Sequence, residues 1–209
     1  MKLTAFGATG GTGRHVIEQA LQTGHQVTAV VRDPQRLMPQ GSGLEVVTAD
    51  VFDPAALASV VSGRDAVISA LGPSGNSPTR VCRDSARSIT TAMREAGTRR
   101  LLVVSNSGNY TDGDSLPVRL LVKPMLQRFL RHAYADMDAM ETEVRDSGLD
   151  WTIVRPPQLT DKPLTAEVRS STTGNVRGSF RISRADLAHY LLRAAGDDAT
   201  SRQTVGVAG

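Results

Sequence analysis

The feature that most constrains this chain is a glycine-rich turn near its N-terminus, GATGGTG at residues 7–13. The turn follows a short apolar run, Leu3–Phe6, and precedes Thr12–Thr23, in which apolar residues recur at helical spacing. Because glycine has no Cβ, the backbone can turn tightly there and approach a ligand closely. A strand, a glycine turn and a helix in this order predict the opening βα unit of a parallel sheet.

The rest of the chain repeats this alternation of short apolar runs and helical patterns. We expect further strands at Gln26–Val31, Leu44–Thr48, Ala66–Leu71, Leu101–Val104 and Trp151–Val154. Helices are expected at Pro54–Val61 with Asp53 as cap, Ser77–Ala96, Ala135–Ser147, and from the capping Ser183 through Ala195. The pattern predicts one α/β domain over residues 1–209, a Rossmann-type doubly wound parallel sheet with helices on both faces and a small C-terminal lobe on the substrate side.

Two segments interrupt the alternation. Residues 106–134 are long for a βα connection, so we expect a functional excursion or a lid there. Within it, an apolar stripe recurs at helical spacing: Leu120, Leu121, Met125, Leu126, Phe129 and Leu130. This stripe has three interpretations, which are core packing as the default, a lid over the substrate, or a subunit contact in a homodimer. Residues 158–181 are polar and rich in turn formers, so we expect them to line the substrate side of a cleft.

Composition excludes several classes of function. The formal net charge is +3 and aromatic residues make up 4% of the chain, which argues against a nucleic-acid arm or a base-stacking surface. The lone cysteine, Cys82, excludes an intrachain disulfide, and we recognise neither a secretory signal nor an apolar run of membrane-spanning length. We therefore expect a cytoplasmic protein without a membrane partner, and the scattered histidines predict no metal site.

The glycine turn predicts a dinucleotide site. Backbone N–H groups at the start of the following helix, together with the helix dipole, hold a pyrophosphate, and the expected residues are Gly7, Thr9, Gly10, Thr12 and Gly13. The alternative is a glycine-rich turn without a ligand. At the end of the second strand, Arg32 and Arg36 suit a 2′-phosphate and favour NADPH over NADH. Asp33 beside them suits a ribose instead, and solvated surface charges are the remaining alternative.

The ends of the third and fourth strands complete the predicted cofactor site. Asp50 and Val51 are placed to approach the adenine edge, and Ala70, Leu71 and Gly72 to pass the cofactor ribose. Ordinary loop and strand-end packing is an equal alternative for each of them.

The order of the segments GATGGTG, VVRDPQRL, TADV, SALGPSG and WTIVRPPQLTDKPLT resembles the atypical short-chain dehydrogenases/reductases of the NmrA-like, NAD(P)-binding set. Within that set the chain resembles the biliverdin IXβ reductase/flavin reductase group, and the resemblance covers nearly the whole chain. It implies NADPH as cofactor and hydride transfer to a flavin, so FMN or FAD as substrate, or to a tetrapyrrole-like acceptor. It also implies that Ser107 lies near the nicotinamide as the catalytic candidate. The implied neighbours on that side are Ser105, Pro156, Pro157 and Gln158, with Asp161.

The chain also departs from that pattern. Gln158 replaces a histidine of the flavin-reductase group, and Arg184 replaces a lysine. Neither Tyr110 nor Tyr134 has a lysine four residues later, so the activated tyrosine of ketone–alcohol chemistry is not expected. His132 is either a surface histidine or an acid near the cleft.

Three functions follow from these residues. The first is an NADPH-dependent reductase that transfers hydride to a small-molecule acceptor, a flavin, quinone or related conjugated compound. The alternative is an NADP(H)-binding redox sensor or regulator without turnover, since the tyrosine–lysine pair is missing. The third, an isomerase or epimerase of the extended family, is disfavoured by the short C-terminal part.

Overall fold

A mostly parallel, eight-stranded sheet carries the fold in the computed structural model, which describes residues 1–37, 40–73, 75, 77–112, 114, 116 and 118–209. The strand order is β3-β2-β1-β4-β5-β6-β10-β8, and β8 alone of these is antiparallel, against β10. In that order the strands span Leu44–Thr48, Gln26–Val31, Lys2–Phe6, Ala66–Ser69, Arg100–Val104, Asp150–Arg155, Gln203–Ala208 and Arg169–Ser171. The first six follow the doubly wound order, so the strand order reverses between β1 and β4, where such sheets bind ligands.

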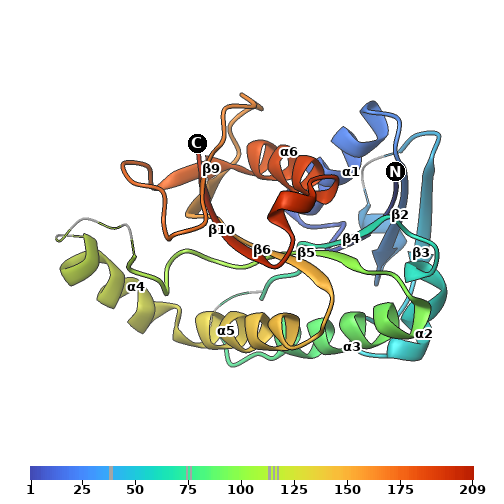
Figure 1. Cartoon of the computed structure of the whole chain (residues 1–209), viewed down its shortest axis with the longest axis horizontal. Coiled ribbons are helices and arrows are strands. Elements are labelled where there is room, and N and C mark those ends of the chain that lie inside the picture. The colour runs from blue at the N-terminus through green and yellow to red at the C-terminus, as the bar shows by residue number, and fades with distance from the viewer. Residues whose placement is uncertain (38–39, 74, 76, 113, 115, 117) are drawn as a thin grey trace.

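Helices cover both faces of this sheet (Figure 1). Helices α1 (Gly11–Gln22) and α6 (Arg184–Ala195) pack on one face, and α2 (Pro54–Val61), α3 (Val81–Ala96) and α5 (Arg131–Arg145) pack on the other. Strand β5 is buried at every position because both of its faces are covered. The predicted α/β, Rossmann-type doubly wound fold is confirmed.

The predicted helix ends are confirmed where the sequence carries a cap. The Asp53 carboxylate accepts a hydrogen bond of 2.9 Å from the Ala55 amide at the start of α2. The Ser183 hydroxyl accepts one of 2.9 Å from the Asp186 amide at the start of α6. Each side chain satisfies an N–H group that the helix itself leaves free.

Several predicted boundaries were wrong. Helix α3 begins at Val81 rather than Ser77, because Pro78 disfavours helical geometry in the residue before it. Helix α5 begins at Arg131, four residues earlier than expected. Strand β10 was not predicted from the sequence, and the predicted loop 158–181 contains short strands. Two of these, β7 (Gln158–Thr160) and β9 (Arg181–Ser183), pair in parallel as a separate small sheet.

The excursion at 106–134 contains the π-helical segment Val118–Val122, α4 (Lys123–Phe129) and the first turn of α5; positions 113, 115 and 117 lie outside the described residues. Figure 1 shows α4 projecting from one end of the molecule. The default of core packing was wrong for most of the stripe, since Leu120, Leu121, Met125 and Phe129 are each 65% to 74% exposed. A lid and a homodimer contact stay predictions. Among the described residues, no helix combines the length and the apolar character needed to cross a membrane.

Candidate functional site

The glycine turn lies where the strand order of the sheet reverses. Gly7 has φ of +76°, and a Cβ built on it would lie 2.6 Å from the carbonyl carbon of Ala70, beyond β4. The Gly10 amide donates a hydrogen bond of 2.9 Å to the Gly7 carbonyl, and a Cβ on Gly13 would lie 2.2 Å from that same oxygen. Backbone contacts therefore require glycine at positions 7 and 13.

The start of α1 is open to an anion. Gly10 is its N-cap and has no side chain to satisfy the free N–H groups, and the first turn carries no acidic residue. Free N–H groups and the positive end of the helix dipole together favour a phosphate at this position. This is the geometry that the sequence predicts for a pyrophosphate.

A cavity of about 380 Å³ opens beside the turn. It brings together Gly7, Arg32, Val51, Leu71 and Gly72, which the sequence assigns to the cofactor site. The lining also includes residues that were not predicted from the sequence: Val30, Phe52, Ser77, Pro78, Thr79 and Val81. Phe52 is half-exposed, and the signal that could have found it is an aromatic residue directly after the predicted Asp50–Val51 pair.

The charged residues around this cavity have different partners. Within the described part of the chain, Arg32 and Arg36 form no ion pair. The Asp33 carboxylate instead accepts a hydrogen bond of 3.0 Å from the Gln35 amide and caps the short 3-10 turn Pro34–Arg36. The Asp50 carboxylate accepts one of 2.9 Å from the Phe52 amide, so it shapes the turn that presents Val51 and Phe52.

Ser107 lies across from the double proline. Its amide donates a hydrogen bond of 3.0 Å to the Pro156 carbonyl, and Ser107 and Pro157 line a second cavity of about 40 Å³. Gln158 lies at the surface, where its side-chain oxygen accepts a hydrogen bond of 3.2 Å from Arg181. The structure thus brings Ser107, Pro156 and Pro157 together and turns the Gln158 side chain toward β9.

The two unusual segments contact each other behind Ser107. The backbone N–H of Asn175 donates a hydrogen bond of 2.7 Å to the Asp112 carbonyl, and the Asn175 side chain donates one of 2.7 Å to the Tyr110 carbonyl. The buried Lys123 ammonium donates to the carbonyls of Ser107 and Tyr110 and lies 3.1 Å from the Asp114 carboxylate. Lys123 was not predicted, because it does not lie four residues after a tyrosine and no other local motif marks it.

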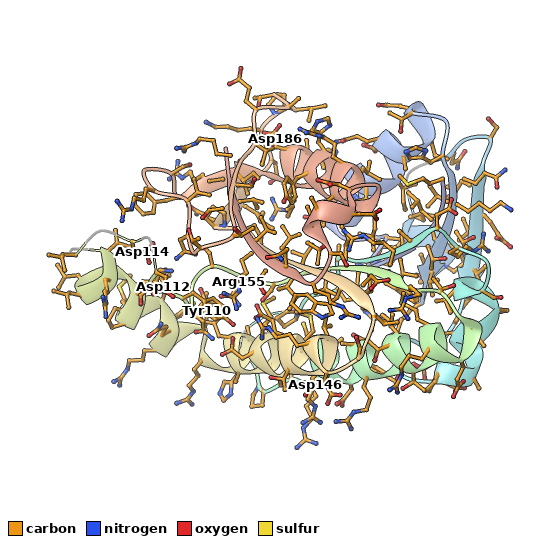
Figure 2. The ribbon with its side chains drawn as sticks, in the orientation of Figure 1. Tyr110, Asp112, Asp114, Asp146, Arg155 and Asp186 are labelled. Atoms are coloured by element: carbon orange, nitrogen blue, oxygen red, sulfur yellow. The ribbon has the colours of Figure 1, made fainter. Side chains whose placement is uncertain are left out.

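Ser105 belongs to a buried polar network rather than to either cavity. Its hydroxyl donates a hydrogen bond of 2.6 Å to the Glu141 carboxylate, which also accepts two from Arg155 and one from Arg145. The Arg155 guanidinium lies 3.1 Å from the centroid of the Tyr110 ring (Figure 2). Burial alone raises the pKa of Glu141, but these hydrogen bonds and charges outweigh it and hold the pKa below its ordinary value.

Tyr110, His132 and Cys82 do not lie in surroundings that would activate them as acids or nucleophiles. Burial is the main cause that raises the pKa of Tyr110, whose hydroxyl donates a hydrogen bond of 2.8 Å to Asp138, so it stays protonated at neutral pH. His132 lies with Met125 and Phe129 in a surface hollow and does not line the Ser107 cavity. Burial also raises the pKa of the Cys82 thiol. No group of three metal-ligating side chains occurs among the described residues.

Comparison with known proteins agrees with this geometry. The chain matches the NAD(P)H-binding family over residues 7–198, a range that includes the glycine turn and α6. The chain belongs to the NAD(P)H-binding family. The open start of α1 and the cavity beside Gly7 therefore lie within the matched range, where a Rossmann-type fold binds its dinucleotide.

Relatives of this NAD(P)H-binding chain include oxidoreductases. It is 27% identical to the uncharacterised protein YwnB of Bacillus subtilis over 92% of this chain and 91% of that protein. It is 31% identical to a (4-alkanoyl-5-oxo-2,5-dihydrofuran-3-yl)methyl phosphate reductase of Streptomyces griseus, over 83% of this chain but 54% of that enzyme. A short-chain dehydrogenase/reductase of Veillonella parvula, solved in complex with NADP, has the same fold, with a TM-score of 0.81, 18% identity, and coverage of 100% and 94%.

Proposed function

We propose that the chain is an NADPH-dependent reductase that transfers hydride to a flavin, a quinone or a related conjugated acceptor. The observation that carries the proposal is that Arg32 lines the same cavity as Gly7 of the glycine turn. A dinucleotide whose pyrophosphate lies at the start of α1 has its adenosine half directed toward the end of β2, where Arg32 follows Val31.

The charges beside β2 support NADPH over NADH. An NAD site presents a carboxylate to the ribose 2′-hydroxyl. Here the Asp33 carboxylate is held by the Gln35 amide, whereas Arg32 and Arg36 have no carboxylate partner among the described residues. Guanidinium groups bind phosphate through charge-assisted and bidentate hydrogen bonds, so these two suit the 2′-phosphate. The Veillonella structural neighbour, solved with NADP, is consistent with this choice.

The chemistry of the second half of the site supports reduction of a conjugated acceptor. Tyr110 keeps its proton, and Lys123 is bound to Asp114 and to two backbone carbonyls instead of to a tyrosine hydroxyl. Hydride passes between stacked rings without a tyrosine acid, because solvent supplies the proton. Ser107, Pro156 and Pro157 are the residues that we expect to face the nicotinamide.

One observation favours a second candidate, an NADP(H)-binding redox sensor without turnover. The cavity beside Ser107 measures about 40 Å³, which suits a water molecule and not a flavin ring. Turnover therefore requires the acceptor to stack outside this cavity, whereas a sensor requires no acceptor at all.

A binding and turnover experiment separates these functions. Purified protein is titrated with NADPH and NADH, and the variant Arg32→Gln is titrated in parallel. We expect Arg32→Gln to weaken NADPH binding far more than NADH binding, and equal losses would contradict the phosphate role. NADPH is then mixed with FMN, FAD, quinones and biliverdin while the nicotinamide absorbance is followed. Tight NADPH binding without oxidation by any acceptor would support the sensor.

A further inference from the structure

The Arg184 side chain lies against the glycine turn, although the two are far apart in the sequence. A Cβ built on Gly11 would lie 2.6 Å from Cδ of Arg184 and 2.8 Å from its Nε. Later in α1, the Gln19 side chain donates a hydrogen bond of 2.9 Å to the Ala185 carbonyl, which joins α1 to the start of α6. Figure 1 shows α1 and α6 next to each other on one face of the sheet. A cation therefore lies at the start of the helix that the dinucleotide approaches.

This position is electrostatically unfavourable for a cation without an anion. Gly11 is the first residue of α1 and Arg184 is the first residue of α6, so the guanidinium lies near the positive ends of two helix dipoles. Asp186 in the first turn of α6 does not pair with it, since its carboxylate accepts hydrogen bonds from Ser183, Thr165 and the Ala166 amide. The arrangement is suited to a ligand with more than one negative charge.

The partner that Arg184 has in the structure is replaceable. Its Nη1 lies 2.6 Å from Oδ1 of Asp161, whose side chain is 87% exposed. Such an exposed ion pair contributes little to stability, because water screens it. The segment that contains Asp161 is also anchored independently, through the hydrogen bonds from Thr165 and Ala166 to the buried Asp186.

We propose that Arg184 is a further cofactor-binding residue, whose guanidinium leaves Asp161 and binds the diphosphate of the dinucleotide at the start of α1. The inference rests on the proposed function, since it requires a dinucleotide on the glycine turn. It also explains why the turn has glycine at position 11, because any side chain there would occupy the space of the Arg184 side chain. The same contact would join the start of α6 to the bound cofactor.

The diphosphate is common to NADPH and NADH, so the effect of Arg184 differs from that of Arg32. Calorimetric titrations of NADPH, NADH and 2′-AMP, which lacks the diphosphate, therefore distinguish the two arginines. We expect Arg184→Gln to weaken both dinucleotides by about tenfold or more, the effect of losing one charge-assisted hydrogen bond, and to leave 2′-AMP binding unchanged. Arg184→Lys keeps the charge and should recover part of the affinity. Arg32→Gln, the matched control, should weaken NADPH and 2′-AMP and spare NADH.

Asp161→Asn is a second variant for the same titrations, because it removes the carboxylate that competes with the diphosphate for Arg184. We expect dinucleotide binding at least as tight as in the wild type. Three results would overturn the role of Arg184: unchanged dinucleotide affinity in Arg184→Gln, an equal loss of 2′-AMP affinity, or a loss in Asp161→Asn as large as that in Arg184→Gln. Wild-type protein that binds neither dinucleotide would contradict the proposed function itself, so the two failures are distinguishable.

Discussion

The Glu141 carboxylate and the Arg155 guanidinium form two hydrogen bonds, of 2.9 and 2.5 Å, in the interior between α5 and the end of β6. Glu141 is fully buried, and it also accepts the Ser105 hydroxyl and one hydrogen bond from Arg145. The network therefore fixes the ends of β5 and β6. After β5 the chain enters residues 105–112, called here the Ser107 loop, and after β6 it enters the double proline.

Glu141→Gln should destabilise the protein by about 3 kcal/mol or more, because it leaves Arg155 without its counter-charge in a buried site. Urea unfolding followed by circular dichroism measures the change in the free energy of unfolding. The matched control is Glu143→Gln on the same helix, whose carboxylate pairs with the exposed Arg87 side chain. The control should cost little, because water screens that pair, and equal losses in the two variants would contradict the role of the network.

Stability should fall as the solution is acidified. The pKa values of Glu141 and Asp186 lie below their ordinary values of 4.5 and 3.8, since hydrogen bonds to both carboxylates outweigh the effect of burial. Groups with a lowered pKa stabilise the fold above the unfolded-state value and lose that contribution as pH falls through the folded-state value. Urea midpoints measured from neutral pH to about pH 3 should therefore decline, with most of the loss below about pH 5. Asp186→Asn should flatten this decline. An unchanged dependence of the urea midpoint on pH would contradict the contribution of Asp186.

Alanine at Gly11 and alanine at Gly13 should have different effects on the free energy of unfolding. A Cβ on Gly13 meets the Gly7 carbonyl oxygen, which is backbone, whereas a Cβ on Gly11 meets the flexible end of Arg184. Gly13→Ala should destabilise by about 1–3 kcal/mol through overpacking, while Gly11→Ala should stay within about 1 kcal/mol of the wild type. Thermal or urea unfolding of both variants checks this difference. A Gly13→Ala protein as stable as Gly11→Ala would show that the turn relaxes easily.

The sheet could be predicted because its signals are local. Each of the first six strands is a short apolar run. Capping residues such as Asp53 and Ser183 directly precede the helices whose starts they mark. Strand β10 was missed because Gly206, a residue type that weakens strands, interrupts its short apolar stretch at residues 205–208. Its assignment depends on pairing with β6, which the sequence does not display.

The site could be predicted in part for the same reason. The glycine turn and Arg32 are recognised from their places after β1 and β2. The contacts of Lys123 with the Ser107 loop and of Arg184 with Gly11 could not be predicted, because they arise only when distant segments fold together. The hydrogen bond from the Gln35 amide to the Asp33 carboxylate could likewise not be predicted, because it depends on side-chain geometry.

Phe52→Ala should weaken dinucleotide binding about tenfold, because Phe52 lines the cavity beside Gly7, where we propose that the cofactor binds, and an aromatic ring there is suited to stacking on adenine. Its side chain is 49% exposed, so the fold should tolerate the change. Titrations with NADPH and 2′-AMP should show similar losses, since both contain adenine. Phe52→Leu, which keeps an apolar side chain without the ring, is the control for stacking. Unchanged affinity for both ligands in Phe52→Ala would place the adenine elsewhere.

Lys123→Met should destabilise the Ser107 loop, because it leaves the buried Asp114 carboxylate without its counter-charge and removes the donor shared by two carbonyls. Breaking a buried ion pair from one side costs about 3–5 kcal/mol, whereas Lys162→Met at an exposed position should cost almost nothing. Hydrogen exchange should show faster exchange of the Ser107 amide, which bonds to Pro156. The double variant with Asp114→Asn should recover part of the stability, since it removes the unpaired charge. Equal stability of Lys123→Met and Lys162→Met would mean that other contacts hold the loop.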